Sequence, residues 1–167
     1  MESHDEIMAR LALAEAVARE GGSTALSYFN SRETLVVETK YDLQDVVSIA
    51  DREVEQLIAS RIRDAFPADG FLGEESGLQA GESDYTWVVD PIDGTSPFLN
   101  GMPSWCVSVA VLRVDVPVIG VIFAPTYQEC YVAALGQGAT LNGHRLQVDP
   151  TRTLQNHVTG FGANSYV

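Results

Sequence analysis

The stretch Trp87-Val88-Val89-Asp90-Pro91-Ile92-Asp93-Gly94-Thr95 decides the fold, because in it an apolar strand-like run leads directly into carboxylates. Pro91 keeps the chain extended after Asp90 and removes a backbone donor, which predicts that the strand ladder ends there. Asp90 and Asp93 can then point into the same space from either side of the bend. One of these carboxylates can bridge two cations while the other holds one. The stretch therefore predicts a strand that carries metal ligands at its end.

The residues that follow predict a place for an anion beside those carboxylates. Gly94 has no side chain, so a ligand can approach the backbone closely. Thr95 is expected to be the N-cap of a short helix, with Pro97 in its first turn and Asn100-Gly101 at its end. A helix N-terminus offers free N–H groups to an anion. Metal ligands next to an anion-binding turn are what a metal-dependent phosphatase requires.

Two further acidic groups follow predicted elements in the same way. Gly73-Glu74-Glu75-Ser76-Gly77 comes after the predicted strand Phe71-Leu72, and Asp51 stands at the start of a predicted helix. Carboxylate oxygens at strand ends suit Mg²⁺ better than softer metals. Taken singly, an Asp-Pro pair is more often a turn, a Glu-Glu pair a solvated loop and Asp51 a helix cap. Together and in this order, the three groups favour a metal site.

The charge balance is strongly acidic. Asp and Glu number 23 against 10 Lys and Arg, which gives a formal net charge of −13. Such a surface repels nucleic acid and anionic membranes, so we expect neither as a partner. It repels phosphate esters as well, unless two or three Mg²⁺ ions reverse the local sign. The chain start lacks a signal-peptide pattern, and no apolar run approaches the roughly 20 residues that span a bilayer. We therefore expect a soluble, cytoplasmic protein.

The hydrophobic periodicity predicts helices first and strands afterwards. Helical spacing runs from about Asp5 to Glu20, where Gly21-Gly22 is expected to stop the helix, and again from Asp51 to Ala65. Extended segments are expected at 35–37, 71–72, 87–89, 107–112, 116–123, 131–134 and 139–141, a loop at 40–44, and tight turns at 114–115, 136–138 and 142–143. The long apolar runs among them predict central strands covered on both faces. This order favours an α+β fold, with layered helices packed on a largely antiparallel sheet.

At these residues the sequence resembles the inositol monophosphatase family, a group of Mg²⁺-dependent and often lithium-sensitive phosphomonoesterases. Residues 87–95 match the family's WxxDPxDGT motif, and residues 73–76 match its GEES segment. Lys40 to Glu55 follows the family's K-x4-D-x-V-[TS]-x-x-D-x-x-x-E pattern. The resemblance implies the family's αβαβα fold, with residues 1–167 as its N-terminal metal- and phosphate-binding portion.

Carried over position by position, the resemblance implies which residues hold the metal. Glu74, Asp90 and the carbonyl of Ile92 would bind the first Mg²⁺. Asp90 would bridge to a second ion, which Asp93 also holds. A third ion is compatible with the same set, and Lys40 is a further candidate near the outer metal site.

The resemblance also implies how the attacking water and the phosphate are held. Glu74 and the Thr95 hydroxyl would orient the nucleophilic water, with that hydroxyl paired to Asp51. The backbone N–H groups of Gly94 and Thr95 would hold the phosphate. No covalent phosphoenzyme is implied, and the family pattern suggests a homodimer.

Two departures from the family pattern leave the substrate open. The family's C-terminal Trp-Asp motif, which supplies its last metal ligand, does not occur in this sequence, so we expect a fragment of a longer enzyme or a truncated product. Ser96-Pro97-Phe98 replaces the Thr-Asn-Phe that is common among inositol-specific members. Inositol phosphate, histidinol phosphate, sugar phosphates and nucleotide phosphates are therefore all candidate substrates. The alternative is a non-catalytic remnant that binds metal and anions without turnover.

Overall fold

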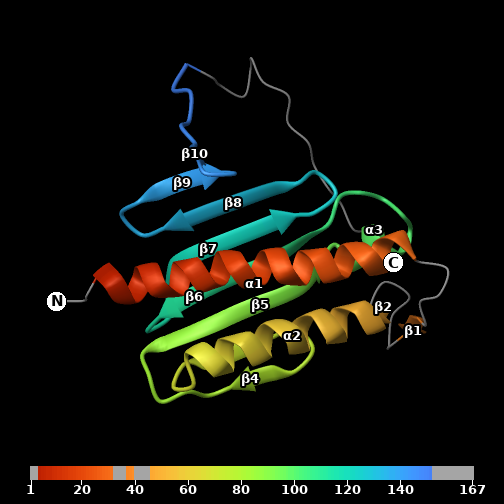
Figure 1. Ribbon diagram of the computed structural model, residues 1–167, viewed down its shortest axis with the longest axis horizontal. Helices are drawn as coiled ribbons and strands as arrows, with labels where there is room; N and C mark the ends of the chain where they lie inside the picture. The colour runs from red at the N-terminus through yellow and green to blue at the C-terminus, as the bar shows by residue number, and fades with distance from the viewer. Residues whose placement is uncertain (1–3, 32–36, 40–45, 152–167) are drawn as a thin grey trace.

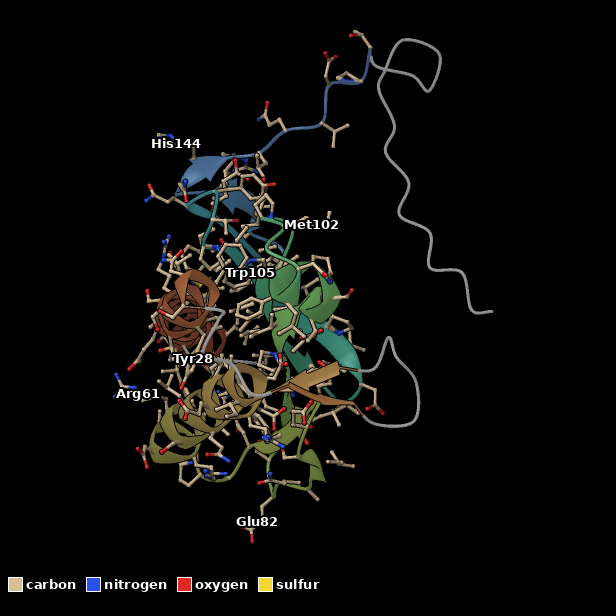
Figure 2. All side chains as sticks on the ribbon, turned by 90° about the vertical axis from the view of Figure 1, so that its right-hand side faces the viewer. Tyr28, Arg61, Glu82, Met102, Trp105 and His144 are labelled. Atoms are coloured by element: carbon tan, nitrogen blue, oxygen red, sulfur yellow. The ribbon has the colours of Figure 1, made fainter. Side chains whose placement is uncertain are left out.

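The computed structural model describes residues 4–31, 37–39 and 46–151. Figure 1 shows α1 (His4–Asn30) and α2 (Ile49–Ala65) lying across the same face of one large sheet. Seen at right angles in Figure 2, both helices lie on one side of the strands. This layered α+β arrangement confirms the predicted fold class. No helix in these ranges is long and apolar enough to cross a membrane.

Within the described residues, eight strands form the large sheet in the order β10-β9-β8-β7-β6-β5-β3-β4. Their bounds are β3 Gly70–Gly73, β4 Gly77–Gln79, β5 Tyr85–Asp93, β6 Cys106–Arg113, β7 Val116–Ala124, β8 Glu129–Ala134, β9 Gly138–Leu141 and β10 His144–Arg145. Neighbouring strands are antiparallel, apart from β3 and β5, which run parallel. A separate antiparallel pair consists of β1 (Val37–Thr39) and β2 (Val46–Ser48).

Several local predictions are confirmed by these bounds. α2 begins at Ile49, just before the predicted start, and ends at Ala65 as predicted. The β6–β7 connection turns through Val114 and Asp115, whose φ angles of 45° and 65° belong to the left-handed region used by tight hairpin turns. The hairpin of β8 and β9 and the turn at 142–143 also form as predicted. The predicted loop at 40–44 lies outside the described residues.

The two faces of the large sheet differ because side chains alternate along each strand. On the face toward α1 and α2, a row across neighbouring strands is buried; it consists of Phe71, Trp87, Val111, Ile119 and Ala134. On the opposite face, here called the open face, Ile122 is 45% and Tyr131 36% exposed. The prediction that the central strands are covered on both faces is therefore wrong for the described residues. Their sequences are apolar on both sides, but helices cover only one side.

α1 continues past Gly21-Gly22 to Asn30, so the predicted stop at these glycines is wrong. Both glycines are buried where α1 packs on α2 and β7. A Cβ on Gly21 would lie 2.9 Å from Ile58 Cδ1, and one on Gly22 would lie 2.4 Å from the Phe123 ring. The glycines therefore permit close packing instead of ending the helix, although each costs about 1 kcal/mol of helix propensity relative to alanine.

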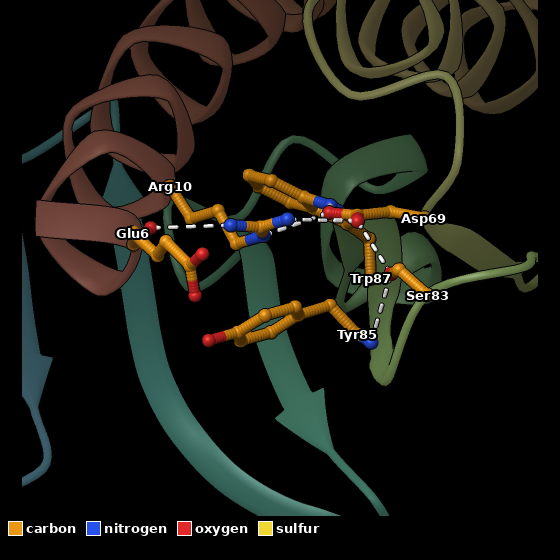
Figure 3. Close-up of polar contacts among 6 residues, drawn as sticks. All are labelled: Glu6, Arg10, Asp69, Ser83, Tyr85 and Trp87. Carbon is orange, nitrogen blue, oxygen red and sulfur yellow. Dashed lines mark hydrogen bonds and ion pairs between the residues drawn. The ribbon is translucent and has the colours of Figure 1, made fainter. Parts of the chain in front are cut away.

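Arg10 of α1 is joined to the chain just before β3 by a buried ion pair with Asp69 (Figure 3). The guanidinium donates from Nε and Nη2 to the Asp69 carboxylate at 2.8 and 2.9 Å. Ser83 Oγ and Trp87 Nε1 donate to the same carboxylate at 2.7 and 2.9 Å. Burial alone would raise the pKa of Asp69, but these hydrogen bonds outweigh it, and the pKa lies below its ordinary value. The network fixes α1 against the β3–β5 side of the sheet.

Candidate metal and phosphate site

The parallel pairing of β3 and β5 brings the carboxyl ends of both strands to one edge of the sheet. Gly73 pairs with Val89, so Glu74 and Asp90 follow at adjacent positions. The N–H of Glu74 donates to the Val89 carbonyl at 3.3 Å, which continues the pairing into the loop. Glu74 is exposed and Asp90 is half-buried. Two of the acidic groups singled out from the sequence are thus held side by side by backbone pairing.

β5 does not end at Pro91, contrary to the prediction. The strand continues to Asp93, with an irregular register between Asp90 and Asp93 opposite Ser108 and Cys106 of β6. A bulge of this kind bends a strand without ending its pairing, and a proline is tolerated within it because the ladder bond is already interrupted. After the bulge, Asp93 is exposed whereas Asp90 is half-buried.

Asp90 is surrounded by other carboxylates. Burial raises its pKa, and the neighbouring charges of Glu74, Asp93 and Asp51, with a hydrogen bond to Glu74, raise it further, to about 7. Its Oδ1 is buried and has no hydrogen-bond partner among the described residues. A buried acceptor in that position costs free energy until a proton or a cation satisfies it. Asp90 is therefore a carboxylate that a proton or a bound cation would stabilise.

Asp51 and Glu55 lie one turn apart on α2, and each is only 3% exposed. A spacing of four residues places them on one face of the helix. Asp51 is close enough to Asp90 to raise its pKa. Glu55 contacts the loop after β3, where its Oε2 and Oε1 accept hydrogen bonds from the N–H groups of Glu75 and Ser76 at 2.8 and 3.0 Å. One helix face thus brings Asp51 near Asp90 and holds the loop after β3 through Glu55.

Gly73 leaves the space that the Glu55 carboxylate occupies beneath this loop. A Cβ at Gly73 would lie 2.5 Å from that carboxylate, closer than atoms can approach. Sequence reasoning placed Glu55 in a motif but gave it no role. The signal that could have identified it is a carboxylate four residues after Asp51, on a helix face that is otherwise apolar, because buried carboxylates are almost always paired.

A hollow of about 330 Å³ opens beside Glu74 and Asp90 on the open face of the sheet. Its lining consists of Leu72, Gly73, Glu74, Val88, Val89, Asp90, Ser108 and Ala110. Ser108 lies directly opposite Asp90 in the strand register. Sequence reasoning missed Ser108, because a serine within an apolar strand has no local pattern that marks a site. The hollow gives a small molecule access to both carboxylates.

Gly94 precedes α3 (Thr95–Leu99) with a φ angle of 97°, a left-handed conformation that favours glycine. A Cβ there would lie 2.9 Å from the Ser104 carbonyl oxygen. Gly94 is the N-cap, so the prediction of Thr95 as the cap is wrong; Thr95 is already the first helical residue. The Thr95 hydroxyl donates to the Ile92 carbonyl at 3.1 Å, whereas pairing with Asp51 was expected. The turn brings that carbonyl within reach of the hydroxyl three residues later.

The donor set at this site consists of carboxylate oxygens, which suit a hard cation such as Mg²⁺. The described part of the chain contains no group of three or more His, Cys, Asp or Glu side chains arranged to hold an ion as they stand. Repulsion among the charges of Glu74, Asp90 and Asp93 opposes a closer arrangement. The buried, unpartnered Oδ1 of Asp90 nevertheless fits a cation that would neutralise the cluster. Lys40 lies outside the described residues.

Comparison with known proteins gives consistent matches. A model of the inositol monophosphatase family matches residues 8–165. An inositol-1-monophosphatase of Rhizobium meliloti is 40% identical over 160 residues, covering 93% of this chain and 59% of that protein. The Nus factor SuhB of Xylella fastidiosa is 40% identical over 146 residues, covering 86% of this chain and 52% of that protein. The crystal structure of extragenic suppressor protein suhB from Bartonella henselae is 35% identical with a TM-score of 0.82, covering 86% of this chain and 56% of that chain. This chain therefore spans little more than half the length of these relatives.

Proposed function

Because the chain belongs to the inositol monophosphatase family, we propose that residues 1–167 are the N-terminal metal- and phosphate-binding portion of a Mg²⁺-dependent phosphomonoesterase. The proposed reaction is hydrolysis of a small phosphate monoester by a metal-activated water. The observation that carries this proposal is Asp90, whose buried Oδ1 lacks a partner among the described residues, while burial and then the neighbouring carboxylates raise the pKa of the group to about 7. Such a group demands a cation, and a cation would let a phosphate dianion approach.

The proposed carboxylate ligands of two or three Mg²⁺ ions are Glu74, Asp90 and Asp93. The carbonyl of Ile92 is a further proposed ligand, because it accepts one hydrogen bond from Thr95 and retains a second lone pair. Bound Mg²⁺ would neutralise the carboxylates, polarise the phosphoryl oxygens and lower the pKa of a bound water, which makes hydroxide available near neutral pH. Lys40 is retained as a proposed residue near the outer metal site.

The proposed phosphate contacts are the N–H groups of Gly94 and Thr95. Gly94 has no side chain to keep the phosphate from the backbone. Glu74 is exposed, and its carboxylate can accept a hydrogen bond from the attacking water and hold it in line with the leaving oxygen. The Thr95 hydroxyl is the second proposed group for this water. In that role the hydroxyl would accept a hydrogen bond from the water while it still donates its own proton to the Ile92 carbonyl.

The test is a phosphate-release screen over inositol, histidinol, fructose and nucleotide phosphates with Mg²⁺, for this chain and for any longer product of the same gene. We expect Asp90→Asn to reduce the rate by about 100-fold or more, since even indirect metal contacts are worth about 10–100-fold. Asp115→Asn, in the exposed β6–β7 turn, is the matched control and should leave the rate unchanged. Equal rates for Asp90→Asn and the unmodified protein would contradict the proposal.

A non-catalytic role is the second candidate, and one observation favours it. The relative from Xylella fastidiosa carries the name Nus factor SuhB and not that of a phosphatase. This alternative predicts Mg²⁺ binding by titration calorimetry without phosphate release from any substrate or any length of chain.

The proposed partners are a small phosphorylated metabolite and a second copy of this chain in a homodimer. That nucleic acid does not bind stays a prediction from the net charge of −13.

A further inference from the structure

We infer that Glu55 is the residue that positions Glu74 for metal binding, by holding the backbone of residues 73–76 from below. This inference rests on the proposed function, since Glu74 is a proposed Mg²⁺ ligand. Glu55 itself faces the loop backbone and not the hollow, so it acts through Glu74 and does not bind the metal. Its contribution is to keep the loop in the one conformation that places the Glu74 carboxylate beside Asp90.

The first observation is that three successive loop N–H groups all have partners. Glu74 N–H donates to the Val89 carbonyl at 3.3 Å, the longest bond of the three. Glu75 and Ser76 N–H donate to the two oxygens of Glu55 at 2.8 and 3.0 Å. β5 therefore holds the loop weakly on one side, and Glu55 holds it firmly on the other. Loss of the Glu55 bonds would leave residues 74–76 held at their ends alone, by the Glu74 contact to β5 and by the pairing of Gly73 with Gly77 across the β3–β4 hairpin.

The second observation is that a carboxylate is the side chain this place requires. Glu55 is 3% exposed, and burying an ionised carboxylate is costly unless it is well paired. An ionised carboxylate accepts from two N–H donors at once, and such charge-assisted bonds are about twice as strong as neutral ones. A glutamine would satisfy one donor with its carbonyl and turn an NH₂ group toward the other.

The third observation is that Gly73 is adapted to Glu55. A Cβ at Gly73 would lie 2.5 Å from the Glu55 carboxylate, so any side chain there would displace it. Gly73 also lines the hollow beside Glu74 and Asp90. The loop, the glycine and the buried carboxylate thus form one unit directly under the proposed metal ligand.

The experiment compares Mg²⁺ binding, measured with Mg²⁺ alone by titration calorimetry, in the unmodified chain and in two variants. Glu55→Gln removes one loop bond, and Gly73→Ala displaces Glu55 from the other side. We expect each to weaken Mg²⁺ binding by about 10–100-fold, the size of effect seen when groups that orient metal ligands are lost. Ile62→Val, a buried change on the same helix far from the loop, is the control; it should lower stability without weakening Mg²⁺ binding.

The outcomes separate this inference from the proposed function. If the unmodified chain binds Mg²⁺ and both variants bind it equally well, Glu55 has no positioning role, while the metal site stands. If the unmodified chain binds no Mg²⁺, the proposed function fails and this inference fails with it. If Ile62→Val weakens Mg²⁺ binding as much as Glu55→Gln does, the effect is one of general stability, and the positioning role is again overturned.

Discussion

Gly94 is constrained both by its left-handed backbone conformation and by a close contact with Ser104. Alanine substitutions at Gly94 and at Gly136 separate these two effects. The Gly94 φ angle of 97° is strained for any other residue, and a Cβ would also meet the Ser104 carbonyl oxygen at 2.9 Å. Gly136 has a φ angle of 77°, but a Cβ there would meet nothing within 4 Å. We expect Gly136→Ala to cost about 1 kcal/mol, and Gly94→Ala about 1–3 kcal/mol more, because only Gly94 adds a clash. Urea unfolding of both variants measures the difference, and equal costs would contradict it.

At this scale the acidic residues of the candidate site could be singled out from the sequence, but the residues that support them could not. Glu74 and Asp90 follow short apolar runs, which is a local pattern. Glu55 has its role only because α2 packs beneath the loop after β3, and Ser108 only because β6 pairs with β5. The Thr95 prediction was wrong because a cap was inferred from residue type, whereas the left-handed Gly94 occupies the cap position.

A substitution at Gly22 tests how closely α1 packs against β7. Alanine is favoured over glycine inside a helix by about 1 kcal/mol, so propensity alone predicts that Gly22→Ala stabilises the protein. A Cβ there would lie 2.4 Å from the Phe123 ring, and overpacking of this kind typically costs about 1–3 kcal/mol. We expect net destabilisation in urea unfolding. Ser23→Ala, exposed at the next position, should change stability by less than about 0.5 kcal/mol. A more stable Gly22→Ala variant would show that the helix can move away from β7.

Helices and strands could be predicted from the sequence where a local residue pattern determines them. α2 and the hairpins of β6–β7 and β8–β9 follow from helical spacing and turn residues. The stop at Gly21-Gly22 was wrongly predicted, because the reason for these glycines is contact with Ile58 and Phe123 from distant elements. The continuation of β5 past Pro91 was missed for a similar reason, since pairing with β6 carries the strand through the bulge.

At the scale of the whole molecule, the network of Arg10 and Asp69 links α1 to the sheet. The folded-state pKa of Asp69 lies below the ordinary value of about 3.9 expected when unfolded. Its contribution is therefore fully present above that ordinary value and is lost as the pH falls through the folded-state pKa. At pH 7, Asp69→Asn should cost about 3–5 kcal/mol, because it leaves the Arg10 charge buried without its partner.

The pH dependence provides the check. Urea unfolding of the unmodified protein and of Asp69→Asn should give a difference in unfolding free energy that is constant from pH 7 to about 5 and shrinks below about pH 4. Asp64→Asn, an exposed position on α2, should track the unmodified protein throughout. A difference that stays the same at acidic pH would mean that the charge of Asp69 contributes nothing.

The open face of the sheet has a consequence for heat capacity. Unfolding raises the heat capacity by about 12–15 cal/mol/K per residue in ordinary domains, because apolar groups become hydrated. Ile122 and Tyr131 are already partly hydrated before melting, so this chain should gain less than that amount. A smaller increment flattens the curve of unfolding free energy against temperature. The unfolding free energy of this chain would then vary less between cold-storage temperature and body temperature than that of a domain whose sheet is covered on both faces.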